Sequence, residues 1–274
     1  MRFNCKGILM EFPKPIVMGI LNTTPDSFYA KSRATNLEKS LQAGNKMIEE
    51  GATIIDVGGY SSRPGADDIS IREEMDRVLP VISFLKLSHP KTLISIDTFR
   101  SEVAEAAIEK GADIINDISG GQIDERILSV AAKYDTPYIL MHMRGTPQDM
   151  MQKTTYSNLL EEVAYYFSER IQLARTAGIK DIILDPGFGF SKTLDQNYDL
   201  MGKLDLLNTL DCPLLVGVSR KSMIYKKLNI DMNDSLNGTT ALNTIALMKG
   251  AQILRVHDVK EAVEAVTLYG ALGG

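Results

Sequence analysis

The hydrophobic positions of the chain form eight short runs that are rich in Ile, Val, Leu and Met and almost uninterrupted by polar residues. Strands that are covered on both faces have this composition, whereas a half-exposed strand alternates apolar and polar positions. Segments with the period of about 3.6 residues that marks amphipathic helices separate the runs. The pattern predicts strands over residues 16–22, 53–59, 93–98, 113–119, 137–143, 181–187, 213–220 and 252–258, and helices over 37–50, 71–86, 102–110, 124–133, 159–176 and 241–249.

Glycine stands just before four of the predicted strands, at Gly51, Gly111, Gly178 and Gly250. A glycine after the last residue of a helix adopts the left-handed conformation at little cost, so these positions predict short turns from a helix into the next strand. Eight alternations of strand and helix predict an α/β fold, a single (β/α)8 TIM barrel domain spanning residues 1–274. An open, doubly wound sheet is the structural alternative.

Composition and charge narrow the class of protein. The chain has 274 residues with a net charge of -5 and no long block of like charge, which gives no footprint for nucleic acid or an anionic membrane. No stretch approaches the roughly 20 apolar residues of a membrane span. Cys5 and Cys212 lie far apart without metal-site spacing, and the thirteen methionines suit a reducing compartment. We therefore expect a soluble, unprocessed, cytoplasmic protein that binds small molecules.

Polar residues follow the apolar runs at the carboxyl ends of the predicted strands, and in a barrel these ends share one face. Asp97, Asn116 and Asp185 end the third, fourth and sixth strands. Their oxygens can bind a planar heterocycle that presents an amino group beside a ring N–H, because a carboxylate accepts two such bonds side by side. Capping of the next helix is the alternative for each of them taken alone.

Cations and hydroxyls lie at the ends of the last two predicted strands, in Ser219-Arg220-Lys221-Ser222 and Arg255-Val256-His257-Asp258. Barrels often bind phosphate at this place, so these residues predict an anion site. Alternation puts Arg255 and His257 on one face and turns Arg220 outward, where we expect it to form a structural ion pair. An oxygen donor at a strand end, Asn22, could help to hold Mg²⁺, although Asn22-Thr23-Thr24-Pro25 also fits a plain turn.

Two long connections, 23–36 and 60–70, follow the first two predicted strands and have the composition of binding loops. The second follows Gly58-Gly59 and contains Ser61-Ser62-Arg63-Pro64-Gly65, where hydroxyls and Arg63 can bind an anion. Met141 and Phe190 could pack on a flat ring, whereas His142 points away from Met141 and is interpreted as structural. The chain shows no zinc-site spacing and no Ser/His/Asp order, which disfavours hydrolases of those classes.

Taken in order, these motifs resemble the dihydropteroate synthase family. The resemblance runs from about Ile16 to the C-terminus and rests on the strand-end motifs above together with Ser95-Ile96-Asp97-Thr98, Asn116-Asp117-Ile118-Ser119-Gly120-Gly121, Met141-His142-Met143 and Asp185-Pro186-Gly187. It implies that 4-aminobenzoate displaces diphosphate from 7,8-dihydropterin-6-ylmethyl diphosphate to give dihydropteroate in folate synthesis, by a largely dissociative step. The resemblance also implies that the protein uses Mg²⁺ as a cofactor, forms a homodimer and is a target of sulfonamides.

The resemblance assigns roles to individual residues. Asp97, Lys221 and Arg255 would be catalytic, and Asn22 would contact the metal. The pterin site would comprise Asp97, Asn116, Met141, Asp185, Phe190, Gly217 and Lys221. The diphosphate site would comprise Asn22, Ser62, Arg255 and His257. The 4-aminobenzoate site would comprise Phe28, Ser62, Arg63, Pro64, Phe190, Lys221 and Ser222.

The chain departs from the family pattern in both long loops. Residues 29–33 replace an acidic residue and glycines, and Tyr60 and Ser62 stand where the family usually has Glu and Thr. Two alternatives therefore accompany the synthase hypothesis. A methyltransferase that binds a methyl-folate in a similar barrel would have no need for the cations of the last two strands. A catalytically silent pterin-binding or scaffold protein is favoured only by the altered loops.

Overall fold

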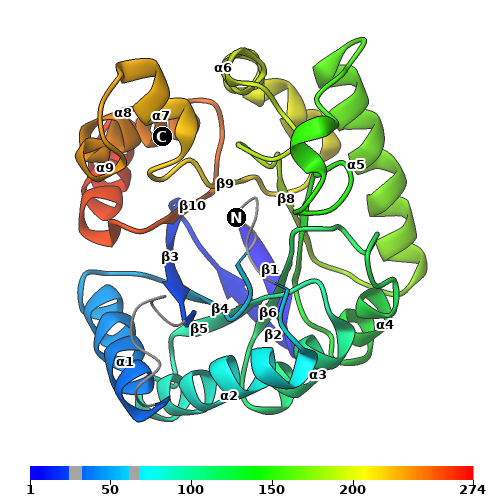
Figure 1. Cartoon of the computed structure of the whole chain (residues 1–274), viewed down its shortest axis with the longest axis vertical. Helices are drawn as coiled ribbons and strands as arrows, with labels where there is room; N and C mark the ends of the chain where they lie inside the picture. Colours follow the sequence, from blue (N-terminus) through cyan, green and yellow to red (C-terminus); the bar gives the residue numbers. More distant parts are fainter. Residues whose placement is uncertain (25–32, 62–67, 274) are drawn as a thin grey trace.

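The computed structural model describes residues 1–24, 33–61 and 68–273. Eight parallel strands form one sheet in the order β8-β7-β6-β5-β4-β3-β10-β9, and a bridge between Leu184 and Leu214 closes the ring. Helices surround the ring (Figure 1). The predicted barrel is confirmed, and the doubly wound alternative is wrong. The strands are β3 (Ile16–Asn22), β4 (Ile54–Gly58), β5 (Leu93–Asp97), β6 (Ile114–Asp117), β7 (Tyr138–Met141), β8 (Ile182–Asp185), β9 (Leu215–Val216) and β10 (Ile253–Val256).

The helices cover the outer face of the barrel and end where the sequence predicts turns. The four glycines before strands have φ angles between +93° and +112°, the conformation that favours glycine. The sequence did not predict α6 or α7, although Thr193 and Gln196 form a capping box at the start of α6. The helices are α1 (Arg33–Glu49), α2 (Ile71–Ser88), α3 (Ser101–Glu109), α4 (Arg126–Lys133), α5 (Leu159–Thr176), α6 (Leu194–Gly202), α7 (Ser222–Leu228), α8 (Leu236–Met248) and α9 (Val259–Ala271), with short 3₁₀ turns η1 (Met150–Gln152), η2 (Leu204–Leu210) and η3 (Met232–Asp234).

An antiparallel hairpin of β1 (Arg2–Cys5) and β2 (Ile8–Glu11) precedes the barrel and was not predicted. Its buried Phe3 and Cys5 pack against an apolar layer to which every barrel strand contributes. In Figure 1 the hairpin lies across the middle of the ring. It therefore plugs the end of the barrel opposite to the strand carboxyl ends. The layer consists of Ile16, Met18, Ile54, Leu93, Ile114, Ile139, Ile183, Leu215 and Ile253.

The interior changes from apolar to polar along the strands. Because alternate residues of a strand share a face, the inward row of β4 runs through Ile54, Asp56 and Gly58. The register pairs Asp56 with Ser95, and Gly58 with Asp97, on the neighbouring β5. A dry layer of side chains thus supports a polar layer at the carboxyl ends, which we call the barrel mouth.

We predict that Phe3→Ala destabilises the barrel. Phe3 is only 2% exposed, and truncation of a buried Phe costs about 3 kcal/mol or more of the free energy of unfolding. Urea denaturation measures this loss. Leu9→Ala in the same hairpin is the control, because Leu9 is 58% exposed and its truncation should change stability by about 0.5 kcal/mol at most. Equal effects of the two substitutions would contradict the plug.

Candidate active site

Arg255 lies at the centre of the barrel mouth and joins three strands. Its Nε donates to Asp56 Oδ2 on β4 at 2.7 Å, and its Nη2 donates to Asp97 Oδ2 on β5 at 2.6 Å. The guanidinium stands on the inward row of β10, directly beyond Ile253 of the apolar layer. One cation therefore holds two carboxylates in place. The sequence placed Asp97 and Arg255 at the same rim but predicted neither ion pair, and it did not indicate Asp56.

Asp97 and Asn116 end neighbouring strands and are paired in the register of β5 and β6. The Asn116 Nδ2 donates to Asp56 Oδ2 at 2.9 Å, so Asp56 contacts both Arg255 and Asn116. Burial raises the pKa of Asp97 to about 7, the positive charge of Arg255 opposes this shift, and the charge of Asp56 adds to it. Asp97 therefore changes its charge near neutral pH.

Asp185 and Lys221 occupy the other side of the mouth. Asp185 Oδ1 accepts from the Gly187 N–H at 2.8 Å, and Lys221 Nζ donates to the Phe188 carbonyl at 2.6 Å. Burial raises the pKa of Asp185 and lowers that of Lys221 to about 8, while the attraction between the two side chains opposes both shifts. Gly187 is required here, because a Cβ on it would lie 2.1 Å from the His142 carbonyl oxygen.

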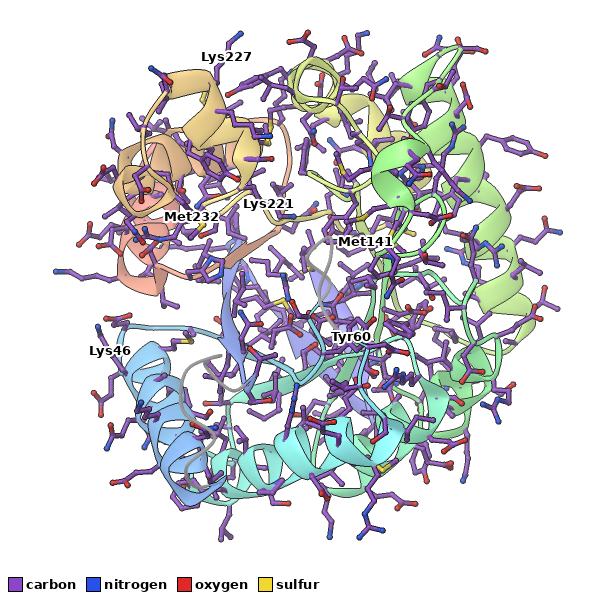
Figure 2. The ribbon with its side chains drawn as sticks, viewed as in Figure 1. Lys46, Tyr60, Met141, Lys221, Lys227 and Met232 are labelled. Carbon is purple, nitrogen blue, oxygen red and sulfur yellow. The ribbon has the colours of Figure 1, made fainter. Side chains whose placement is uncertain are left out.

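The aromatic and small residues expected around a flat ring also lie at the mouth. Phe190 has the Lys221 ammonium 4.9 Å from its ring centre, and Met141 belongs to the apolar cluster against which Phe190 packs. A Cβ on Gly217 would lie 3.8 Å from Lys221 Nζ, so the glycine keeps space open beside it. In Figure 2, Met141, Lys221 and Tyr60 lie around the middle of the barrel, whereas Lys46 and Lys227 lie at its periphery.

The last two strands place His257 and Ser219 together. The His257 backbone N–H donates to Ser219 Oγ at 3.1 Å, and the same oxygen lies 3.1 Å from His257 Nδ1. His257 has solvent-exposed atoms. Partial desolvation of its ring by the surrounding protein, together with the positive charge of Arg255, lowers its pKa to about 4, so the ring is neutral at pH 7. Arg220 turns outward and binds both oxygens of Asp258 at 2.9 and 2.8 Å, which confirms the expected ion pair.

Asn22 lies at the end of β3 with its side chain exposed at the mouth. A Cβ on Gly58 would lie 3.7 Å from Asn22 Oδ1 and 3.6 Å from Asp97 Oδ2. Because glycine has no side chain, Gly58 leaves room between Asn22 Oδ1 and Asp97 Oδ2. Among residues 1–24, 33–61 and 68–273, no three His, Cys, Asp or Glu side chains cluster as a metal site would require.

Tyr60, one of the departures from the family pattern, packs at the rim of the mouth. Its ring meets Phe99 edge to face at 5.1 Å, and the Arg100 guanidinium lies 5.2 Å from its centre. Its hydroxyl accepts from Gln148 Nε2 at 3.0 Å, which links the segment after β4 to the segment after β7. Tyr60 also borders the apolar cluster that contains Met141.

A buried lysine that the sequence did not indicate holds the segment after β8. Lys192 is 2% exposed, and its Nζ donates to the carbonyls of Gly187 and Phe190 at 3.0 and 3.1 Å. The same nitrogen lies 2.9 Å from His142 Nδ1, so His142 has a structural contact as expected. Burial lowers the pKa of Lys192 to about 7 and that of His142 well below its usual value.

The structure thus brings most of the predicted site residues into one mouth. Ser222 begins α7 directly after Lys221. Phe28, Ser62, Arg63 and Pro64 lie outside the described residues. The residues that sequence reasoning missed are Asp56 and Lys192. A carboxylate inside an otherwise apolar run could have revealed Asp56, because it alternates with Ile54 and Gly58. No comparable signal marks Lys192.

The comparisons with known proteins agree with this geometry. The family model described as "Pterin binding enzyme" matches residues 18–257. This range begins in β3 and ends at His257, so it covers all the barrel strands that build the mouth. The match shows that the chain belongs to the pterin-binding enzymes, and its relatives identify it more narrowly as a member of the dihydropteroate synthase family.

Two of these relatives are dihydropteroate synthases. The protein of Synechocystis sp. is 46% identical over 261 residues, which cover 93% of this chain and 89% of that protein. The protein of Escherichia coli is 44% identical over 273 residues, 99% of this chain and 96% of that protein. Among solved structures, the Yersinia pestis dihydropteroate synthase with a sulfonamide drug complex has a TM-score of 0.92 at 42% identity, covering 100% of this chain and 99% of that one. The Xanthomonas albilineans synthase with 4-aminobenzoic acid has a TM-score of 0.92 at 37% identity, covering 100% and 98%.

We predict that Lys192 makes the fold more stable as the pH rises. Its pKa in the folded state, about 7, lies below the ordinary value of 10.5, so the unfolded chain holds more protons between these values. The contribution of Lys192 to the free energy of unfolding therefore increases across this range and is complete above the ordinary value. Lys192→Met should remove it, as urea denaturation at several pH values would show. Lys203→Met, at an exposed pair with Asp199, is the control and should follow the wild type.

Proposed function

We propose that this protein catalyses the dihydropteroate synthase reaction, in which 4-aminobenzoate displaces diphosphate from 7,8-dihydropterin-6-ylmethyl diphosphate. The observation that carries the proposal is that hydrogen-bond acceptors and cations lie together in one barrel mouth. Hydrogen-bond acceptors that suit a heterocycle rich in N–H groups stand beside cations that suit a leaving anion. Relatives that are named dihydropteroate synthase over nearly the whole chain support the same reaction.

The pterin would lie between Asp185, Asn116 and Lys221. Asp185 has one oxygen committed to the Gly187 N–H and can offer its carboxylate to adjacent N–H groups of the ring. Lys221, still charged at pH 7, can donate to a ring nitrogen or carbonyl. Met141, Phe190 and the open space at Gly217 would enclose the faces of the ring. This assignment follows the chemistry of the donors and acceptors.

The diphosphate would leave toward Arg255, His257 and Asn22. A fixed guanidinium stabilises negative charge as the C–O bond breaks, and it does so without reorganising, because two carboxylates already hold it. Asp97 would stabilise the positive charge that spreads over the pterin, which favours a largely dissociative step. The arylamine is already nucleophilic, so the reaction needs no strong general base.

A magnesium ion belongs to this proposal. Mg²⁺ is bound by few protein oxygens and keeps several waters, which fits the exposed Asn22 Oδ1 and the space at Gly58. When bound, the ion would neutralise charge on the diphosphate. The 4-aminobenzoate site would draw on Phe190, Lys221 and Ser222, together with the expected residues Phe28, Ser62, Arg63 and Pro64 of the long loops.

The cations separate this proposal from its alternatives. A methyl-folate methyltransferase would use the acceptors of the mouth but has no diphosphate, so it would have no need for the Lys221 ammonium and the Arg255 guanidinium beside those acceptors. A silent scaffold would keep both sets of groups and show no turnover. The synthase is therefore favoured by the cations and is distinguished from the scaffold by an activity measurement.

We predict that the purified protein, given both substrates and Mg²⁺, releases diphosphate and forms dihydropteroate. Asp185→Ala and Lys221→Ala should each weaken pterin binding at least about tenfold, because each leaves a buried charge without its partner. Lys227→Ala is the matched control, since this lysine is exposed on α7. Absence of product with the wild type would reject the synthase, and normal pterin affinity in both site variants would remove those residues from the site.

We further propose a cytoplasmic homodimer of single-domain subunits that span residues 1–274. The helices α8 and α9 pack against each other and carry exposed apolar side chains: Ile245 and Met248 on α8, and Leu268 on α9 with Leu272 directly after it. Such a surface is typical of a contact between subunits. Both cysteines are buried free thiols, which suits a reducing compartment. Among the described residues, no helix has the length and apolar character to cross a membrane.

We predict that Met248→Glu converts the dimer to monomers of 30.2 kDa, because it places a charge in the apolar contact. Light scattering after size-exclusion chromatography measures the mass. Leu87→Glu is the control: Leu87 on α2 is 82% exposed, compared with 70% for Met248, and lies on a different helix. A monomeric wild type would contradict the proposed assembly, and so would a dimer that survives Met248→Glu.

A further inference from the structure

We infer that Asp56 is a positioning residue that fixes both Arg255 and the amide of Asn116, an inference that rests on the proposed function. Asp56 lies in the middle of β4, paired in the register with Ile20 on one side and Ser95 on the other. Its side chain is completely buried beneath the groups expected to contact the ligand. It acts through those two neighbours and lies one layer below the mouth.

The first effect is on the guanidinium. Asp56 binds Arg255 through Nε, while Asp97 binds it through Nη2, so the two carboxylates fix both the position and the plane of the group. Within the described parts of the chain, Nη1 donates no hydrogen bond. The two contacts therefore leave the N–H groups of Nη1 and the second N–H of Nη2 as donors for an anion. Without Asp56, Arg255 would be held by Asp97 alone and could rotate about that contact.

The second effect is on the chemistry that Asn116 offers. A carboxylate oxygen accepts hydrogen bonds, so the contact at 2.9 Å turns the amide nitrogen of Asn116 toward Asp56 and engages one of its two N–H groups. The amide oxygen points away from Asp56 and is the acceptor that Asn116 can offer to a ligand. Together with Asp97 and Asp185, the mouth thus presents acceptors to a ring edge that must supply N–H donors. Asp56 in this way selects the hydrogen-bond pattern of the ligand.

The burial of Asp56 indicates that stability does not explain its presence. Among the described residues, its other oxygen, Oδ1, is buried and has no hydrogen-bond partner, and the same holds for Ser95 Oγ on the adjacent strand. Each such atom carries a desolvation cost, which reduces what the buried carboxylate contributes to stability. Ile54 occupies the preceding inward position of the same strand at no such cost. A charge retained here is better explained by the two groups it orients.

The test uses the full chain with Asp56→Asn and pteroic acid as the probe. The variant should fold, because Asp97 still neutralises Arg255. We expect its affinity for pteroic acid to fall at least about tenfold, corresponding to about 1.4 kcal/mol. In turnover, kcat/KM for the pterin substrate should fall while KM for 4-aminobenzoate is unchanged. Because the charge of Asp56 raises the pKa of Asp97, the midpoint of the acidic limb of the binding profile should move to lower pH.

Asp113→Asn is the matched control. Asp113 is another buried carboxylate, but it stands before β6 at the opposite end of the barrel, where it binds Lys86 Nζ at 2.7 Å and the Ile94 N–H at 2.9 Å. It should lose stability without a change in affinity or in the pH midpoint. The inference is overturned if a folded Asp56→Asn keeps the wild-type affinity and pH profile, or if both variants change them equally.

An exchange of the two groups tests the orientation of the amide directly. Asn116→Asp alone puts two carboxylates against each other and should weaken pteroic acid binding at least about tenfold. The double variant Asp56→Asn with Asn116→Asp reverses donor and acceptor and should recover part of the affinity. These measurements also serve if Asp56→Asn alone does not fold. Wild-type affinity in Asn116→Asp, or no recovery in a folded double variant, overturns the inference.

Failure of the inference and failure of the proposed function are distinguishable. The wild-type protein must first bind pteroic acid and release diphosphate. If it does neither, the synthase proposal is wrong whatever Asp56 does. If the wild type is active and the Asp56 variants behave like it, the synthase proposal stands and Asp56 has no positioning role.

Discussion

The ion pairs of Arg255 with Asp56 and Asp97 are the interaction on which the barrel mouth depends. A buried carboxylate carries a large desolvation cost, and two carboxylates side by side also repel each other. One guanidinium placed between them offsets both penalties through its Nε and Nη2 contacts. The pair spans β10, β4 and β5, so it also joins the last barrel strand to strands that lie early in the chain. Loss of the cation would leave an uncompensated charge at the centre of the fold.

The apolar layer makes this arrangement possible by excluding water from below. Phe3 of the hairpin and Ile54 of β4 belong to the layer that fills the opposite end of the barrel. The polar groups above it are therefore held by protein atoms on all sides except the mouth. This explains why Asp97, Asp185 and Lys221 all have pKa values shifted toward neutrality by burial. The apolar layer that closes one end of the barrel thus also contributes to the pKa shifts at the other end.

Sequence reasoning succeeded where a residue's position on a strand determines its place in space. Asp97, Asn116 and Arg255 were found because strand ends converge in any parallel barrel, whatever the details of packing. Sequence reasoning failed where tertiary contacts decide whether a segment forms a strand and how long that strand is. The hairpin strands have only four residues each and gain their stability from the barrel that they close. The seventh barrel strand, expected over 213–220, shortens to Leu215–Val216 in the structure.

The causes of the other omissions are equally specific. Lys192 has the sequence neighbours of an exposed loop, and only the fold reveals that three acceptors surround its ammonium group. A search restricted to the last residue of each strand does not find Asp56, because Asp56 occupies the inward position two residues earlier. Alternation links this position to the end residue Gly58, so a polar residue two places before a strand end deserves the same weight as the end itself.

The charges of the mouth also bear on how an anion could be bound there. Three carboxylates, Asp56, Asp97 and Asp185, face two cations, Arg255 and Lys221, while the low pKa of His257 keeps it neutral at pH 7. With Asp97 ionised the sum is -1, and with Asp97 protonated it is zero. These five groups therefore supply no excess positive charge for a diphosphate. The proposed Mg²⁺ beside Asn22 would add positive charge where these five groups have none to spare. In that proposal the fixed guanidinium would contribute direction, and the metal would contribute charge.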